Sequence, residues 1–149
     1  MAGIHVEGLS SAPPEVYSSH LQAGDYDVIV QSCDLTTART GSQGVKFDLL
    51  VEEGPSQTLP DGVTQVSAVG RHLFDTAWLP TPSQKDGGDY CRRHLAKIVE
   101  TLRVGPNDDL DLQEFVGKRA KVRVKVVTKD SEGADLTDPR NEIVRWMAL

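Results

Sequence analysis

The stretch from Lys118 to Val127 constrains the fold of this chain more than any other. It reads K-R-A-K-V-R-V-K-V-V, and from Arg119 onward basic and apolar residues alternate strictly. Residues two apart share a face of an extended strand, so this pattern predicts a strand with one apolar and one cationic face. We call its cations the basic stripe: Arg119, Lys121, Arg123 and Lys125.

The basic stripe contrasts with an acidic chain, whose formal net charge is −6 and whose pI is about 5.1. A row of like charges repels itself, which indicates either nearby counter-charges or an anionic partner. The alternative is a solvated outer face, on which Lys and Arg keep the strand soluble and unpaired. An acidic total does not exclude nucleic-acid binding, because the position of the positive charge decides it.

Length and composition limit the class of protein. A chain of 149 residues with 38% hydrophobic residues fits one domain with one core. No apolar run approaches the roughly 20 residues that cross a bilayer, and no secretory signal is expected at the N-terminus. Cys33 and Cys91 form no CxxC pair, which suits small buried side chains in a reducing cytoplasm. We therefore expect a cytoplasmic protein without a membrane partner.

Turn signals separate an N-terminal arm, residues 1–23, from a domain over residues 24–149. The arm holds Pro13 and Pro14 and shows no lasting periodicity. In the domain, β-branched and alternating runs predict five strands, and polar loops are expected at 34–43 and 130–139. The five expected strands span 26–32, 45–53, 71–79, 119–129 and 142–148.

One long helix is expected between the third and fourth of these strands, from Tyr90 to Val104. Asp89 is its expected N-cap, and Gly105 with Pro106 should end it. The order β-β-β-α-β-β is that of a β-rich, all-β OB-fold, a five-stranded Greek-key barrel with one α-helix between strands three and four. A small α+β sheet with the helix on one face is the rival architecture.

Several segments resemble the bacteriophage-encoded OB-fold single-stranded DNA-binding proteins of phage replication and recombination clusters. The resemblance lies in the pattern and order of segments and covers most of residues 24–149. The segments are G-D-Y-D-V-I-V at 24–30, T-G-S-Q-G-V-K-F-D-L-L-V at 40–51, R-H-L-F-D-T-A-W-L at 71–79, L-D-L-Q-E-F-V-G-K-R-A-K-V-R-V at 110–124 and N-E-I-V-R-W at 141–146.

The resemblance implies binding of single-stranded DNA without sequence preference and without catalysis. Replication or recombination proteins and further copies of the chain are additional candidate partners. Bacterial housekeeping single-strand binders recruit partners through an acidic tail, whereas this chain ends at Leu149 directly after the last expected strand. Recruitment through such a tail is therefore not expected.

Single-strand binding requires cations along the backbone and flat side chains on which bases stack. Aromatic residues make up only 5% of the chain. Phe47 and Trp146 share parity with apolar neighbours, which favours the core for both. Phe74 and Trp78 are candidates for stacking, but neither face of their strand is cleanly apolar, so the sequence leaves its orientation open.

OB-folds bind along strands two and three and between the loops that join strands one to two and four to five. The expected nucleic-acid contacts are therefore the basic stripe, the two aromatic candidates and six further cations, while Arg92, Arg93 and Lys97 on the helix are expected to be solvated. The full set is Arg39, Lys46, Arg71, Phe74, Trp78, Arg119, Lys121, Arg123, Lys125, Lys129, Arg140 and Arg145.

Enzyme functions find little support in the sequence. The four histidines are scattered without HExxH or Cys/His ligand spacing, and no phosphate-binding glycine loop is present. A nuclease site from Asp25, Asp48 and Asp75 is a minor alternative, since acidic residues at strand ends are more often solvated or paired. We expect no enzyme activity, no metal and no cofactor. The main alternative function is a structural or adaptor domain that binds protein and ignores DNA.

Overall fold

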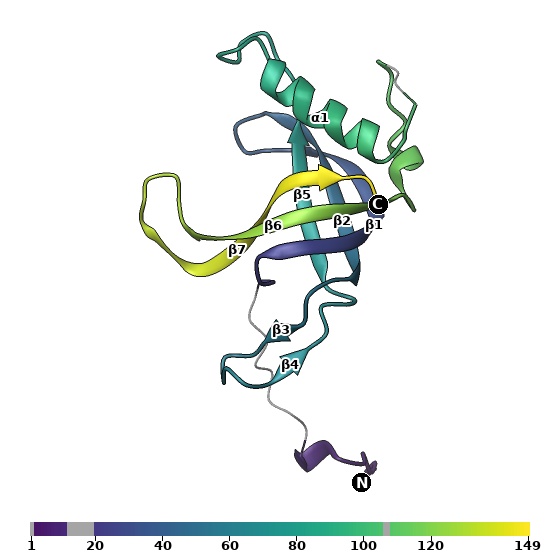
Figure 1. Ribbon diagram of the computed structural model, residues 1–149, viewed down its shortest axis with the longest axis vertical. Coiled ribbons are helices and arrows are strands. Elements are labelled where there is room, and N and C mark those ends of the chain that lie inside the picture. Colours follow the sequence, from purple (N-terminus) through teal and green to yellow (C-terminus); the bar gives the residue numbers. More distant parts are fainter. Residues whose placement is uncertain (1, 12–19, 106–107) are drawn as a thin grey trace.

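Five long strands form one antiparallel sheet with the order β5-β2-β1-β6-β7 (Figure 1). The computed structural model describes residues 2–11, 20–105 and 108–149. A helix, α1, packs at one end of the sheet, and a small two-stranded hairpin lies at the other end (Figure 1). The strands are β1 (Gly24–Thr37), β2 (Gln43–Glu53), β3 (Gln57–Thr58), β4 (Gln65–Val66), β5 (His72–Trp78), β6 (Arg119–Lys129) and β7 (Asp135–Met147); the helices are η1 (Leu9–Ser11), α1 (Asp89–Thr101) and η2 (Leu112–Phe115).

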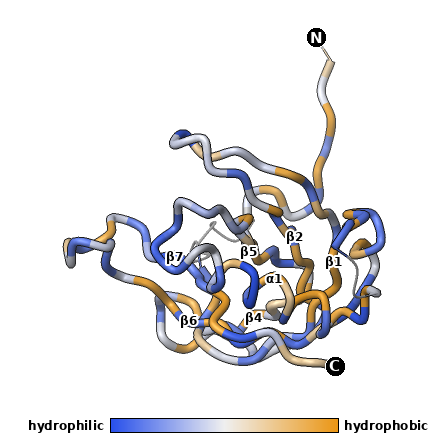
Figure 2. Tube along the Cα trace, turned by 90° about the horizontal axis from the view of Figure 1, so that it is seen from above, coloured by the Kyte–Doolittle hydropathy of each residue, from blue (hydrophilic) through white to orange (hydrophobic). Residues whose placement is uncertain are grey.

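β1 is the central strand and pairs with β2 on one side and β6 on the other. Alternate residues of these strands turn inward, as in Val28, Leu49 and Val122, all of which are buried. Seen from above, the hydrophobic positions of the strands gather toward the middle of the curled sheet (Figure 2). The period-two alternation predicted for β2 and β6 is thereby confirmed, because one face of each strand lies in the core.

Two strands are longer than the sequence indicated. β1 continues through residues 34–37, which were expected in a loop, because Leu35 pairs with Val45 and Thr37 with Gln43. β7 begins at Asp135, inside the expected polar loop, because Lys129 pairs with Asp135 and Val127 with Arg140. In both places polar residues are part of the strand, because backbone pairing continues into the hairpin. Neither face of the strand is fully buried there, so polar side chains are tolerated.

The two edge strands, β5 and β7, approach each other through side chains. The indole Nε1 of Trp146 on β7 donates to Oδ2 of Asp75 on β5 at 2.8 Å. The buried Trp146 ring also packs edge-on against Phe47 with 5.6 Å between ring centroids. Among the described strands no backbone ladder joins β5 to β7. The fold is thus a β-rich antiparallel sheet with one α-helix, and the core positions predicted for Phe47 and Trp146 are confirmed.

The caps of α1 differ from the prediction at both ends. Gly88 with φ 90° precedes the helix, and the Asp86 carboxylate accepts from the backbone N–H groups of Gly88 at 3.0 Å and Tyr90 at 2.7 Å. Asp86 therefore satisfies the free N–H groups in place of Asp89, which is the first helical residue. The helix ends at Thr101 instead of Val104, and the expected terminator Pro106 lies outside the described residues.

The chain enters the sheet through a fixed segment just before β1. Leu21 is buried, and its backbone N–H and C=O bond the Asn141 side chain at 2.7 and 2.8 Å. Next to it, the Gln57 amide donates to the Tyr26 hydroxyl at 2.8 Å, which ties β3 to β1. The prolines expected to mark an irregular arm, Pro13 and Pro14, lie outside the described residues. None of the described helices is long and apolar enough to cross a membrane.

Candidate nucleic-acid interface

The outer face of β5 carries the exposed aromatic side chains that the sequence could not orient. Leu73 and Ala77 point into the core, so the residues of opposite parity face outward. Phe74 is 53% exposed and Trp78 is 38% exposed, and the His72 ring stacks beside Phe74 with 6.2 Å between centroids. We call His72, Phe74 and Trp78 the aromatic strip. Phe74 and Trp78 are thereby placed on the surface that a stacking role requires.

A cation from the neighbouring strand lies over the aromatic strip. Lys46 on β2 points outward, and its Nζ sits 5.0 Å from the centre of the Phe74 ring. This cation–π contact leaves the ammonium exposed at the surface, where it can meet an anion. On the other side of Phe74, Nδ1 of His72 lies 2.7 Å from the Asp48 carboxylate. Lys46 and Phe74 therefore present a positive charge and a flat ring side by side.

Gly44 makes room for the Trp78 ring. The two residues are opposite each other on β2 and β5. A Cβ at Gly44 would lie 2.9 Å from Cε3 of Trp78 and 2.9 Å from Cγ2 of Thr76. Because the indole lies across the glycine backbone, a larger residue there would displace the ring from the strand surface. The sequence segment T-G-S-Q-G thus contains a glycine that positions the strip.

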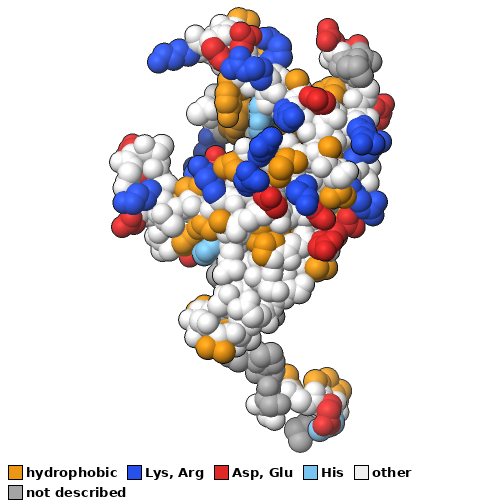
Figure 3. All heavy atoms as spheres, viewed as in Figure 1, with side chains coloured by type: hydrophobic (Ala, Val, Ile, Leu, Met, Phe, Trp, Pro, Cys, Tyr) orange, Lys and Arg blue, Asp and Glu red, His pale blue; other side chains and the backbone are white. Residues whose placement is uncertain are grey.

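The basic stripe meets carboxylates along its whole length. Arg119 Nε lies 2.8 Å from Glu52, and Arg123 Nε lies 2.9 Å from Asp25. Lys121 Nζ is 3.6 Å from Asp27, and the remaining stripe lysine is 3.7 Å from its partner. That last pair is Lys125 with Glu142. Figure 3 shows Lys and Arg side chains intermixed with Asp and Glu over the middle of the molecule.

Counter-charges on β1 and β2 therefore explain how the row of cations is tolerated. Asp25 and Asp27 lie on the outward face of β1, directly across from Arg123 and Lys121. The hydrogen bond from Arg123 is the main cause that lowers the pKa of the Asp25 carboxyl, and the charges of Lys121 and Arg145 lower it further. The four cations of the basic stripe are thus matched by four carboxylates.

The remaining predicted cations fall at separate places. Arg39 is exposed in the β1–β2 hairpin, at the end of the sheet where Trp78 pairs with Gly44. Arg145 is exposed on β7 and lies directly opposite Arg123 of the stripe. Two more belong to the projecting β6–β7 hairpin (Figure 1), in which Lys129 lies 3.5 Å from Asp135 and Arg140 is exposed.

Arg71 precedes β5 but belongs to a different environment from the aromatic strip. It is half-buried on the side of the molecule that holds the Tyr26 phenol. Burial raises the pKa of that phenol, while the hydrogen bond with Gln57 and the charge of Arg71 act in the opposite direction. The structure thus brings Lys46, Phe74 and Trp78 together and leaves Arg71 apart from them.

Sequence reasoning overlooked two rings, one within the aromatic strip and one beside it. His72 was used only to assign parity, although its ring stacks on Phe74. Tyr90 was read as the start of the helix, but its exposed ring stacks parallel to His94, and it lines a small cavity of about 170 Å³ together with Trp78. Because His72 and Phe74 are two residues apart on one strand, the sequence could have indicated that their rings are neighbours. Nothing in the sequence indicated that Tyr90 lies near Trp78.

A reactive or metal-binding arrangement would draw on the free cysteine Cys33 or on the acidic and histidine side chains. Burial raises the pKa of the Cys33 thiol to about 12, so this cysteine is protonated and a poor nucleophile at neutral pH. Within residues 2–11, 20–105 and 108–149, no group of three or more His, Cys, Asp and Glu side chains could hold a metal ion. What the described surface offers is rings and cations for binding.

Comparison with known proteins gives a family without assigning a function. No curated protein matches the chain. The family described as "Protein of unknown function (DUF669)" matches residues 11–136, which include β1 to β6 and α1 but only the first two residues of β7. Because this match covers most of the 149 residues, the chain belongs to the DUF669 family.

Proposed function

We propose that this protein binds single-stranded DNA without sequence specificity, as a non-catalytic OB-fold domain over residues 24–149. The strand order β5-β2-β1-β6-β7, with α1 between β5 and β6, supports an OB-fold assignment. In that assignment β5 and β7 are the third and fifth strands of the barrel. The hydrogen bond from Trp146 to Asp75 lies between these two edge strands. The outer face of β2 and β5 is then the usual binding face.

The observation that carries the proposal is the exposed pairing of Phe74, Trp78 and Lys46 on β5 and β2. Large aromatic side chains are normally buried, and full burial is worth about 1.5–3 kcal/mol, of which the half-exposed Phe74 and Trp78 forgo a part. Bases that stack on such rings recover about 1–3 kcal/mol per base, irrespective of sequence. Lys46, held over the Phe74 ring, supplies a charge for the adjacent phosphate.

The basic stripe has a secondary role in this proposal. Its ion pairs are exposed, and such pairs are worth about 0–1 kcal/mol because water and salt screen them. A phosphate can therefore replace a carboxylate at Arg123 or Arg119 at little cost. The basic stripe extends the positive surface that single-stranded DNA meets beyond the aromatic strip. The carboxylates paired with the stripe reduce its contribution to binding.

The biological setting follows from the chemistry and from the resemblance to phage single-strand binders. Such a protein covers unwound DNA during phage-type replication or recombination in the host cytoplasm. It protects that DNA from nucleases and from secondary structure, with no cofactor. Replication or recombination proteins are its proposed protein partners.

Fluorescence anisotropy with a labelled oligo-dT at low salt tests the proposal. We expect wild-type binding, and we expect Phe74→Ala and Trp78→Ala each to weaken it by about 1–3 kcal/mol, which is roughly five- to 150-fold in Kd. Val63→Ala, which truncates an exposed apolar residue in the loop between β3 and β4, is the control and should leave Kd unchanged. Absence of wild-type binding at low salt would refute the proposal. Equal loss in the control would show a general effect unrelated to stacking.

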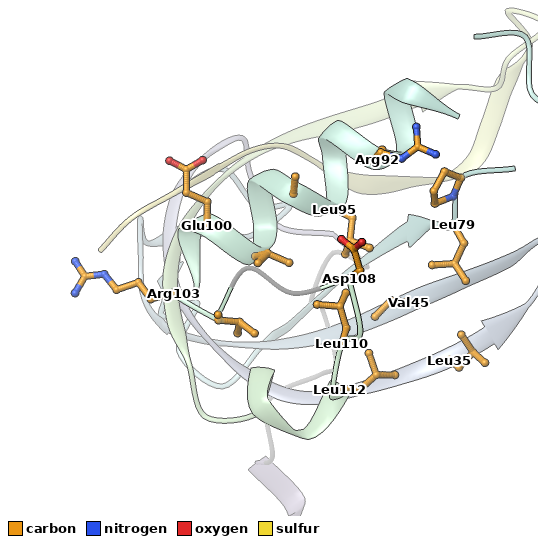
Figure 4. A pocket seen from close by; sticks show the side chains of 15 residues that line it. Leu35, Val45, Leu79, Arg92, Leu95, Glu100, Arg103, Asp108, Leu110 and Leu112 are labelled. Atoms are coloured by element: carbon orange, nitrogen blue, oxygen red, sulfur yellow. The ribbon is translucent and has the colours of Figure 1, made fainter. Parts of the chain in front are cut away.

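A protein-binding adaptor is the second candidate, and one observation favours it. An apolar groove lies between α1 and the sheet, and no residue of the aromatic strip lines it (Figure 4). Exposed apolar surface of this kind is typical of protein contacts. An adaptor that ignores DNA would show no anisotropy change at any salt concentration, so the same measurement separates the two functions.

A further inference from the structure

An apolar groove lies under α1. Its volume is about 1120 Å³, and it is bounded by α1, the ends of β1 and β2, and Asp108, Leu110 and Leu112 near η2 (Figure 4). Leu95 and Val99 of the helix face Leu35, Leu110 and Leu112 across it. Leu35 is 56% exposed although it stands in a strand. The helix therefore leaves apolar side chains of the sheet end uncovered.

The size and rim of the groove indicate what kind of occupant fits. Small-molecule sites usually measure about 300–1,000 Å³, so this groove suits a segment of polypeptide. Its rim carries charges of both signs, Arg92 and Arg103 against Glu100 and Asp108. A balanced rim favours an occupant with little net charge and bulky aliphatic side chains.

The N-terminal segment of the chain has these properties. Ile4 is 91% exposed and Leu9 is 65% exposed, with Val6 also exposed between them. Its charged side chains, His5 and Glu7, pair with each other at 3.0 Å. Large aliphatic residues that nothing in their own chain covers mark a surface for another molecule. Because the chain carries a net charge of −6, copies repel one another unless they meet through such nearly neutral segments.

The segment and the groove lie at opposite ends of the molecule. The chain leaves the domain at Leu21, clamped by Asn141, and the N-terminal segment extends away from α1 (Figure 1). The groove lies at the far end of β1 from the point where the chain enters it, since Gly24 begins that strand and Leu35 lies near its end.

We infer that the N-terminal segment, residues 2–11, of one copy docks in the α1 groove of a second copy. The two surfaces differ and lie at opposite ends, so the contact is heterologous and links copies head to tail. Ile4, Val6 and Leu9 enter the apolar floor, and Glu7 meets the Arg103 side of the rim. This contact does not involve the aromatic strip and stands whether or not the protein binds DNA.

Sedimentation equilibrium of the full chain without DNA tests this inference. For the wild type, the average mass should rise with concentration above the single-chain 16.2 kDa. Leu35→Glu in the groove, and Ile4→Ser with Leu9→Ser in the segment, should each raise the dissociation constant at least about tenfold, which is about 1.4 kcal/mol. Leu35, Ile4 and Leu9 are all exposed, so these changes leave the core intact. Ala96→Glu, at another exposed groove position, repeats the groove test if Leu35→Glu fails to fold.

Mixing the groove variant with the segment variant gives the decisive result. Each supplies the half that the other lacks, so the mixture should form a one-to-one complex of twice the single-chain mass and nothing larger. A wild type that stays monomeric at every concentration overturns the inference. That result would be expected if the groove bound the segment of its own chain or a different partner. Association as strong as that of the wild type in either variant, or a mixture that fails to form the complex, overturns it as well.

Discussion

At the scale of single residues, Arg103 adopts a backbone conformation that its residue type disfavours. Among the described residues it is the non-glycine residue with a positive φ, 57°. It ends α1 in a Schellman arrangement: its N–H donates to the Glu100 carbonyl at 3.2 Å, and the Val104 N–H donates to the Val99 carbonyl at 3.1 Å. Glycine normally occupies this position because a Cβ is strained there. The sequence signal, Gly105, lies two residues too late.

Arg103→Gly should therefore stabilise the protein. Relief of the left-handed conformation is worth about 1–2 kcal/mol, and the extra freedom of glycine in the unfolded chain offsets about 0.5–1 of it. We expect the free energy of unfolding in urea to rise by about 0.5–1 kcal/mol. Lys97→Gly in the interior of α1 is the matched control and should lower it by about 1 kcal/mol. If both variants lose stability alike, strain at Arg103 is not the reason.

At the scale of elements, one carboxylate joins β5, β7 and α1. Asp75 accepts from Trp146 on β7 and lies 3.4 Å from Nε2 of His94 on the helix. The hydrogen bond with Asp75 raises the pKa of His94, against the opposing effect of burial. Tyr90 stacks on His94, and Glu142 lines the same small cavity. When it is protonated, the His94 imidazole links the helix to the two sheet edges through Asp75.

This contact should make stability depend on pH. Because the pKa of His94 is higher in the folded than in the unfolded protein, its contribution is complete below the unfolded value of about 6.5. It is lost as the pH rises through the folded value. We expect the thermal midpoint to fall over that range in the wild type, and His94→Gln to remove this part of the dependence. The two proteins should differ most at low pH; identical profiles would show that His94 does not supply the link.

At the scale of the whole molecule, positive charge is not concentrated where the sequence is most basic. The chain is acidic overall, and the basic stripe is matched by Glu52, Asp27, Asp25 and Glu142. Lys46 lies over the Phe74 ring instead, and the carboxylate on the same face of β2, Asp48, is held by His72, so an anionic strand is expected to meet a usable charge at Lys46. Binding should then depend on a few cations only.

The salt dependence of oligo-dT binding measures this distribution. For single strands, each phosphate contact contributes about 0.7 to the slope of log K against log salt. Lys46→Gln should reduce the slope by about that amount, whereas the paired change Asp25→Asn with Arg123→Gln should change it little. Lys97→Gln on α1 is the control with the same loss of charge. If reversal of the basic stripe abolishes binding while Lys46→Gln has no effect, the binding face is on β6 instead of β5.

Residue patterns predicted much of this architecture, for reasons visible in particular elements. β2 and β6 alternate cleanly, so Phe47, Val122 and the stripe were assigned to the correct faces. The element order and the single helix followed from turn residues and from helical spacing around Leu95 and Ile98. β5 could not be oriented, because Asp75 shares parity with Leu73 and Ala77 while Phe74 and Trp78 share the other. The inward Asp75 is acceptable only because Trp146, remote in sequence, donates to it.

The sequence by itself determined the alternation, the order of elements and the presence of a cationic row, since these depend on neighbours along one strand or helix. Only the tertiary structure decided that the row faces carboxylates on β1 and β2, that Phe74 and Trp78 lie outside beside Lys46, and that a groove stays open beneath α1. Each of these depends on which distant side chains meet. Pairing across strands and helices sets local charge and exposure, and a linear pattern does not contain it.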